Sequence, residues 1–208
     1  ISALTTNVSH FFREKQHFHM LRDEIAASRL SACSGQEIRI WSAGCSNGQE
    51  AYSIAMTVLE SVAEAGVTNL RILATDIDPE VVRFARKATF PDRLMNGVSD
   101  GLRQKYFSRT TDQNGEAVYT AKPELRKLIK FNTLNLLSEW PMKRKFDVVF
   151  CRNVVIYFDL KTQTDLWSRY RKILKPNGIL FLGHSERIAD PSVFGFDCTG
   201  PTTYRRRA

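Results

Sequence analysis

The apolar residues of this chain gather in short runs with the length of buried strands, and helix-type repeats separate several of them. The runs occupy residues 38–41, 70–75, 129–132, 146–151 and 179–182. Apolar positions recur every three to four residues from 51 to 62, which predicts a helix that stops near Gly66. Further helices are predicted at about 79–87 and 160–174. This alternation favours an α/β fold with a mostly parallel sheet and helices on both faces.

The alternation breaks between about residues 90 and 127. Asn114-Gly115 is a hairpin signal, and it lies between the strand-type segments 106–108 and 117–119. We therefore expect a small antiparallel insertion at about residues 106–121. An isolated hairpin is marginally stable in water, so this one has to lean on the main domain or on a partner.

Both ends of the chain carry further patterns. An apolar stripe predicts an amphipathic N-terminal helix packed on the sheet, and it consists of Phe11, Phe12, Phe18, Leu21 and Ile25. Residues 194–198 and 202–205 are expected to form a terminal antiparallel pair.

A glycine-bracketed loop follows the first strand. Gly44 and Gly48 give the spacing G-x-x-x-G, which is neither the dinucleotide fingerprint nor the P-loop. Glu50 follows directly, and a carboxylate there would repel a pyrophosphate but suit a cationic or hydroxyl-rich ligand. An equally open interpretation is that the glycines only make a tight turn.

A second acid stands at the end of the second strand. Asp76 occupies the position from which an acid typically binds ribose hydroxyls in a βαβ unit. With Glu50 it indicates an adenosine-type ligand without phosphates, and S-adenosylmethionine fits this description. The alternative is that Asp76 caps the helix that begins near Pro79.

Length and composition indicate one ordinary globular domain. The chain has 208 residues, 43% of them apolar, with no secretory signal and no apolar run long enough to span a bilayer. Its four cysteines form no C-x-x-C pair and no zinc pattern with the histidines, so we expect reduced thiols in the cytoplasm and no metal. Because the chain begins at Ile1, an upstream segment is expected to have been removed.

The charge of the chain is strongly positive. An excess of 30 Lys and Arg over 22 Asp and Glu gives +8, which favours an acidic partner or nucleic acid, although a merely solvated basic surface is as common. The side chains considered as contacts for an acidic partner are Arg83, Arg86, Lys87, Arg103, Lys105, Arg126 and Lys127.

Several segments together resemble the CheR-type chemotaxis receptor methyltransferases. They are TTNVSHFFRE (5–14), WSAGCSNGQEAYSIAM (41–56), ATDID (74–78), FCRNVVIYFD (150–159), LKPNGILFLGHSE (174–186) and the terminal TTYRRR. The resemblance covers nearly the whole chain, with every motif in the expected order. One departure is Gln49, where the family often has an acid before the acid matched by Glu50.

The resemblance implies a Rossmann-like fold of the S-adenosylmethionine-dependent methyltransferases. Residues 1–208 would form the catalytic domain, with a β-subdomain inserted at about 100–128, and the family's upstream helical domain is absent here. The implied reaction methylates glutamate side chains on the cytoplasmic helices of chemoreceptors and leaves S-adenosylhomocysteine. The resemblance further implies a cytoplasmic protein that binds no nucleic acid and does not insert into the membrane, and that is expected to be a monomer. In some members the subdomain binds a peptide at the receptor's C-terminus.

The resemblance also assigns site residues. Those implied for cofactor binding are Asn7, Ser9, Arg13, Gly44, Glu50, Asp76, Asn135, Leu136, Asn153 and Val154. Arg13 and Tyr157 are the implied catalytic residues, and we expect no catalytic Cys or His because a glutamate with a pKa of about 4.3 is already ionised at pH 7. Plainer alternatives are an ion pair of Arg13 with Glu14 or Glu24 and a first-turn helix role for Glu50.

Two other functions compete with this hypothesis. A nucleic-acid methyltransferase would use the same cofactor, but the chain has neither a Pro-Pro-aromatic run nor a Pro-Cys nucleophile. A non-catalytic signalling module that keeps the fold and binds the cofactor or a receptor remains compatible with the sequence.

Overall fold

The computed structural model describes residues 9–27, 30, 37–65 and 69–208, and within them the main sheet has seven strands in the order β6-β2-β1-β7-β8-β10-β9. The first five of these run parallel, whereas β10 pairs antiparallel with β8 and with β9. The strands are β1 (Ile38–Ala43), β2 (Leu70–Asp76), β6 (Ile129–Thr133), β7 (Phe146–Cys151), β8 (Leu174–Leu182), β9 (Phe196–Gly200) and β10 (Thr203–Arg206). The predicted mostly parallel sheet and its terminal antiparallel pair are both confirmed.

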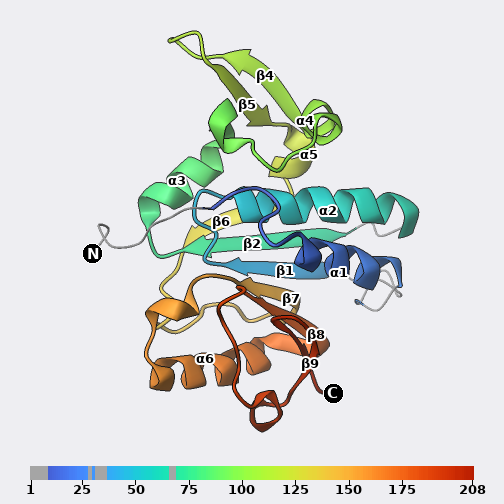
Figure 1. Cartoon of the computed structure of the whole chain (residues 1–208), viewed down its shortest axis with the longest axis vertical. Helices are drawn as coiled ribbons and strands as arrows, with labels where there is room; N and C mark the ends of the chain where they lie inside the picture. Colours follow the sequence, from blue (N-terminus) through green and yellow to red (C-terminus); the bar gives the residue numbers. More distant parts are fainter. Residues whose placement is uncertain (1–8, 28–29, 31–36, 66–68) are drawn as a thin grey trace.

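Helices cover both faces of this sheet (Figure 1). On one face, buried side chains of α1, α2 and α3 pack in a single apolar cluster with Ile40 and Ile72. On the other face, α6 packs in a second cluster with Trp41, Val149 and Leu180. The helices are α1 (Lys15–Ala26), α2 (Gln49–Ala65), α3 (Pro79–Lys87) and α6 (Leu160–Ile173). None of the helices in the described residues combines the length and the apolar character needed to cross a membrane.

The first helix begins later than the apolar stripe suggested. Phe12 and Glu14 have φ of 55° and 56°, so the chain turns sharply before α1 and Phe11 and Phe12 lie outside the helix. The ring of Phe11 is fully buried and packs edge-on against Phe90, with centroids 5.2 Å apart. The contact between Phe11 and Phe90 therefore holds this turn against the segment around Phe90. Arg13 lies in the middle of the turn, between Phe12 and Glu14.

The strand predicted at 179–182 also proved longer. β8 begins at Leu174 and includes the segment 175–178, which the sequence suggested as a turn. Asn177 has φ of 62°, and the pairing of β8 with β7 shifts register near Phe146. An irregularity in the strand therefore replaces the expected turn.

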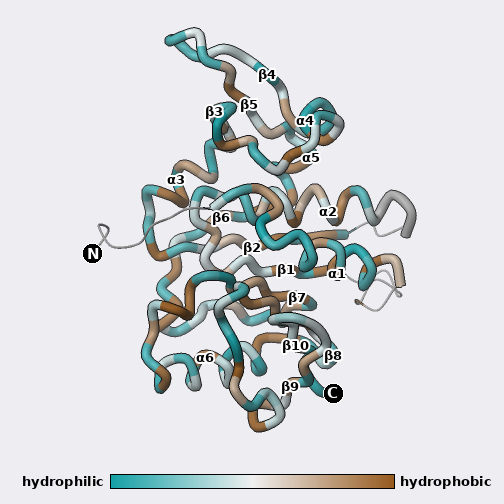
Figure 2. Tube along the Cα trace, in the orientation of Figure 1, coloured by the Kyte–Doolittle hydropathy of each residue, from teal (hydrophilic) through white to brown (hydrophobic). Residues whose placement is uncertain are grey.

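A second, three-stranded antiparallel sheet stands apart from the main one, at the top of Figure 1, in the order β3-β5-β4. The predicted hairpin at Asn114-Gly115 is present, with the Asp112 carboxylate accepting bonds from the N–H groups of Asn114 and Glu116. Figure 2 shows that the hairpin tip is hydrophilic. The elements here are β3 (Thr89–Pro91), a 3₁₀ turn (Asp92–Leu94), α4 (Asp100–Tyr106), β4 (Phe107–Thr111), β5 (Ala117–Ala121) and α5 (Pro123–Arg126).

The small sheet is tied to the main domain at its base. Lys105 Nζ lies 2.7 Å from Glu60 Oε1 on α2, and the Tyr106 hydroxyl donates to the same carboxylate. The hairpin projects from this base, so its β4 edge is open within the described residues.

Candidate active site

A cavity of about 640 Å³ opens where the parallel strands of the main sheet end. The carboxyl ends of β1, β2, β6, β7 and β8 lead into the segments that line it, as expected for a ligand site in an open α/β sheet. Ten of the eleven site residues named from the sequence line this cavity, and the eleventh, Asn7, lies outside the described residues. The ten are Ser9, Arg13, Gly44, Glu50, Asp76, Asn135, Leu136, Asn153, Val154 and Tyr157.

The glycine loop after β1 is pressed against its neighbours. Gly44 has φ of 127°, and a Cβ added there would lie 2.3 Å from Val154 Cγ2. The N–H groups of Gly44 and Cys45 both donate to the Thr75 carbonyl, at 2.8 and 2.9 Å. Because glycine is needed for this close approach, the tight turn expected at Gly44 is confirmed. The loop also leaves Ser46 Oγ buried at the cavity without a hydrogen-bond partner among the described residues.

Asp76 is held by the backbone rather than capping a helix. Its Oδ2 accepts from the Ser46 N–H at 2.8 Å, and its Oδ1 from the Asp78 N–H at 3.1 Å. The cap of α3 is Asp78, which accepts from the Glu80 N–H. Burial raises the pKa of Asp76, although these N–H groups oppose the shift. Each carboxylate oxygen retains a lone pair that can accept from a hydroxyl.

Glu50 lies in a buried ion pair. Its Oε1 accepts from Ser42 Oγ at 2.7 Å, and its Oε2 lies 3.2 Å from Arg152 Nη1. Burial raises the pKa of Glu50, while Arg152 and Ser42 act in the opposite direction. The neighbouring Gln49 donates to the Leu94 carbonyl and is not part of the cavity lining, so its departure from the family pattern leaves the cavity lining unchanged.

Arg152 is the main residue that sequence reasoning missed. Its side chain is 2% exposed, and its Nη2 lies 3.3 Å from Glu14 Oε2 and donates to the Arg13 carbonyl. The guanidinium therefore sits between the Glu14 and Glu50 carboxylates. The available signal was its position beside Asn153, directly after the apolar strand β7.

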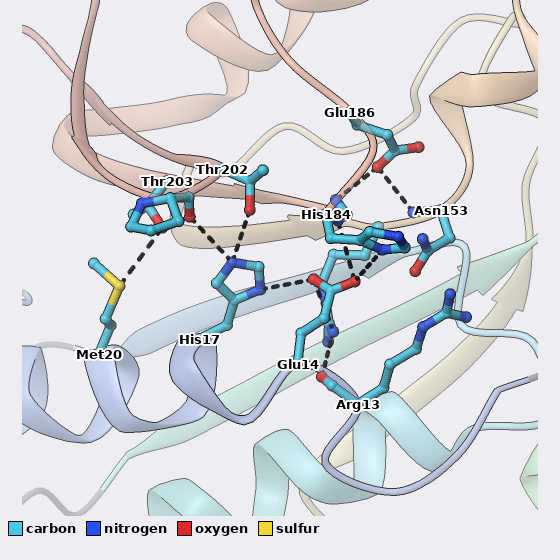
Figure 3. A network of polar contacts seen from close by, with 12 residues as sticks. Arg13, Glu14, His17, Met20, Asn153, His184, Glu186, Thr202 and Thr203 are labelled. Carbon is cyan, nitrogen blue, oxygen red and sulfur yellow. Dashed lines mark hydrogen bonds and ion pairs between the residues drawn. The ribbon is translucent and has the colours of Figure 1, made fainter.

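Glu14 connects three segments of the site (Figure 3). Besides Arg152, its carboxylate contacts His17 Nδ1 at 3.5 Å and His184 Nδ1 at 3.3 Å. Glu24, the other acid considered as a partner of Arg13, pairs with Arg205 at 2.8 Å. In Figure 3 the Arg13 side chain extends toward Asn153, and both residues line the cavity.

Another buried carboxylate, that of Glu186, fixes the loop that follows β7. Its two oxygens accept from the N–H groups of Asn153, Val154 and Gly183, at 2.7 to 2.8 Å. Asn153 has φ of 58°, so the loop makes a sharp turn that these bonds stabilise. These hydrogen bonds hold the segment that carries Tyr157 against the end of β8.

The cavity mouth is unusually apolar. Among the described residues, six large hydrophobic side chains are exposed, and four of them line this cavity. These four are Ile77, Leu137, Ile156 and Tyr157. Such a rim loses water readily when a ligand or substrate covers it.

Cysteine and metal chemistry find no support in the described part of the chain. Burial raises the pKa of both Cys45 and Cys151, and neither these nor Cys198 line the cavity. No group of three or more potential metal ligands occurs among the described residues. His10 and His184 do line the cavity, which the sequence did not suggest.

The family model and the relatives that match this sequence are described as the same kind of protein. A family model described as "CheR methyltransferase, SAM binding domain" matches residues 7–202. A probable chemotaxis protein methyltransferase of Rhizobium etli is 45% identical over 206 residues, covering 99% of this chain and 76% of the relative. A chemotaxis protein methyltransferase of Borreliella burgdorferi is 38% identical over 212 residues, covering 99% and 72%. Among solved structures, magnesium protoporphyrin IX methyltransferase of Synechocystis PCC 6803 with bound SAM aligns with a TM-score of 0.49 and 15% identity, covering 93% of this chain and 79% of that one.

Proposed function

This chain belongs to the CheR methyltransferase family and is an S-adenosylmethionine-dependent chemotaxis protein methyltransferase; we propose that its acceptors are glutamate side chains on the cytoplasmic helices of a chemoreceptor. The observation that carries the proposal is the convergence of Arg13, Glu50 and Asp76 on one cavity at the ends of the parallel strands. The two acids suit the donor, and the arginine suits a carboxylate acceptor.

The residues around the cavity fit S-adenosylmethionine. The close approach at Gly44 and the unpartnered Ser46 Oγ indicate a loop shaped to lie against a ligand. Asp76 would hold the ribose hydroxyls, and Glu50 would hold the ammonium group. Asn135 and Leu136 would flank the adenine, with Ser9, Asn153 and Val154 completing the wall.

The proposed reaction needs orientation more than proton transfer. Bound S-adenosylmethionine supplies a methyl group activated by a sulfonium. The acceptor glutamate is ionised at pH 7, and the Arg13 guanidinium can hold its carboxylate through a planar pair of N–H groups. Alignment of two reacting groups can contribute about 7–11 kcal/mol when it is complete.

The turn around Arg13 supports its role in positioning. The left-handed residues Phe12 and Glu14 flank it, its carbonyl accepts from Arg152, and the Phe12 N–H donates to Ser53 Oγ at 2.9 Å. Tyr157 lies at the mouth, half exposed, where its ring or hydroxyl can contact the acceptor side chain. The apolar rim around it would exclude water once the substrate is bound.

The partner, location and assembly follow from the same proposal. We expect the enzyme to act in the cytoplasm as a monomer, on the helical cytoplasmic region of a chemoreceptor. The open edge of β4 offers main-chain groups to which the receptor's C-terminal peptide could add as a strand.

The proposal is tested by incubating the protein with methyl-labelled S-adenosylmethionine and a receptor cytoplasmic fragment. We expect base-labile methyl esters on glutamate, abolished by Arg13→Ala while the affinity for S-adenosylhomocysteine is largely kept. The matched control is Arg22→Ala, which removes an exposed arginine of α1 that pairs with Asp23. Cofactor binding without transfer by the wild type would favour a signalling module, and label on nucleic acid would favour the other methyltransferase class.

A further inference from the structure

One half of a sheet face is left without a helix. α1, α2 and α3 pack on one face of the main sheet, whereas on the other face α6 covers β7 and β8. The connection between β6 and β7, residues 134–145, contains neither helix nor strand. Doubly wound sheets normally bury both faces under helices. Arg71 of β2 and Lys130 of β6 therefore remain exposed on this second face.

The bare half forms an open groove of about 870 Å³, and its lining is strongly cationic. Glu37 is the one acid among the described residues that line it. The cations are Arg39, Arg71, Lys127, Lys130 and Arg144, and these five side chains together with Glu37 define what we call the basic groove.

A single carboxylate serves three of these cations. Glu37 lies 2.6 Å from Arg39 Nη1, 3.4 Å from Arg71 Nε and 3.7 Å from Arg144 Nη1. Lys127 and Lys130 make no ion pair with the described residues, and Arg39 Nε is buried without a hydrogen-bond partner among them. The groove thus keeps a large positive excess that an acidic partner would neutralise.

Three cations outside the groove each have an acidic partner of their own. Arg83 pairs with Glu80 at 2.7 Å, and Lys105 pairs with Glu60 at the same distance. Arg103 pairs with Asp92. These three belong to the set considered from the sequence for an acidic partner, of which Lys127 alone lines the basic groove. The structure therefore favours the basic groove as the candidate surface for such a partner.

The floor of the groove is apolar, which narrows the kind of partner. Leu73, Leu134 and Met142 are half-buried in it, and the ring of Phe146 is almost fully buried beneath Arg39. No exposed aromatic ring lines the groove within the described residues, so it lacks the stacking surface that single-stranded nucleic acid requires. Cations above an apolar floor match an amphipathic helix with an acidic face.

We propose that the basic groove binds an acidic amphipathic helix of a partner protein, which takes the place of the helix missing between β6 and β7. The groove meets the active-site cavity at Thr75 and Leu134, which line both. Arg13 and Tyr157 line only the cavity, so a helix bound in the groove would leave the proposed acceptor side open.

The test uses the intact chain and a fluorescein-labelled 18-residue helix of Glu and Leu, with Leu on one face. Binding is followed by fluorescence anisotropy at several salt concentrations. We expect the double variant Arg71→Glu, Lys130→Glu to raise Kd at least tenfold, equal to about 1.4 kcal/mol. The matched control, Lys161→Glu with Lys172→Glu on exposed positions of α6, changes the net charge equally and should keep Kd within twofold.

Three results would overturn the proposal. An equal loss in the control variant would mean that only net charge matters. Equal binding of a peptide with Ser in place of every Leu would remove the role of the apolar floor. An oligonucleotide that binds as tightly and depends on Arg71 and Lys130 would assign the groove to nucleic acid. Unchanged affinity for S-adenosylhomocysteine reports that the double variant is folded. If the double variant does not fold, Arg144→Glu replaces it in the test, because the Arg144 side chain is 77% exposed.

Discussion

The sharing of Arg152 between two buried carboxylates leads to a specific prediction for Glu14. Arg152 Nη1 lies 3.2 Å from Glu50, and Nη2 lies 3.3 Å from Glu14. Glu14→Gln keeps the shape of the side chain but removes its charge. The Arg152 guanidinium is then expected to pair with Glu50 alone, so the Glu50 carboxylate would bind a ligand ammonium less strongly. Glu14 would thus be a positioning residue that acts through Arg152.

The size of the effect follows from the burial of the group. A hydrogen bond to a charged partner contributes about 1.5–3 kcal/mol. If Glu14→Gln removes one such bond between Glu50 and the ligand, S-adenosylhomocysteine should bind about 10- to 100-fold more weakly, since 1.4 kcal/mol is tenfold. Methylthioadenosine has the same nucleoside but no amino-acid head, so its affinity should be unchanged.

Calorimetric titration of both ligands distinguishes this positioning role from a structural one. The matched control is Glu24→Gln, because Glu24, which lies on α1, is 7% exposed and pairs with an arginine, but that arginine is Arg205 and not Arg152. An equal loss for both ligands would show that Glu14 only stabilises the fold. No loss for either ligand would show that Arg152 keeps its place without Glu14.

The remaining predictions concern the ribose site, a buried histidine and the insertion. Asp76→Ala should weaken S-adenosylhomocysteine at least tenfold, from lost charged hydrogen bonds of about 1.5–3 kcal/mol; unchanged affinity in calorimetry would refute the assignment. Burial and the adjacent Arg152 lower the pKa of His17 to about 4. Because the unfolded histidine titrates near 6.5, its contribution to stability is complete above that pH and is lost as pH falls from about 6.5 to 4. Urea unfolding should therefore show wild type losing about 2 kcal/mol more than His17→Gln between pH 7 and 5, and identical losses would contradict this. Deleting residues 112–116 should leave cofactor affinity intact, whereas a collapse would make the hairpin part of the main core.

Local patterns predicted most of the fold, and they failed where the backbone departs from them. The buried strands and α3 follow directly from apolar runs and from Pro79. The start of α1 was wrong because Phe11 and Phe12 continue the apolar stripe, and nothing local announces the left-handed residues Phe12 and Glu14. The turn expected after α6 became part of β8 because pairing with β7 overrides the local signal at Asn177 and Gly178.

The cavity lining was predictable where residues stand at strand ends or in recognisable motifs, as Asp76 and Asn153 do. The role of Glu186, which does not itself line the cavity, was not predictable, because the N–H groups that it accepts from at Asn153 and Val154 are more than 30 residues away in the chain. Arg152 was missed for a similar reason. An arginine after an apolar strand ordinarily lies at the surface, and only the folded structure brings Glu14 and Glu50 to its two sides.

The cost of this arrangement indicates what it is for. Removing two carboxylates and a guanidinium from water carries a desolvation penalty that their mutual attraction often does not recover, so well-packed apolar residues would stabilise the fold as well or better. Glu50 and Arg152 nevertheless lie buried in the cavity wall, with Glu14 partly buried against Arg152, and together the three carry one negative charge in excess when both acids are ionised. Asp76 in the same cavity adds to that excess, and the glycine loop, residues 44–48, contains no cation, so the site favours a cationic head and disfavours a phosphate. The acid at Glu50, which in the sequence argued against a pyrophosphate, is thus held in place in the fold by Arg152 without its charge and that of Glu14 being cancelled together.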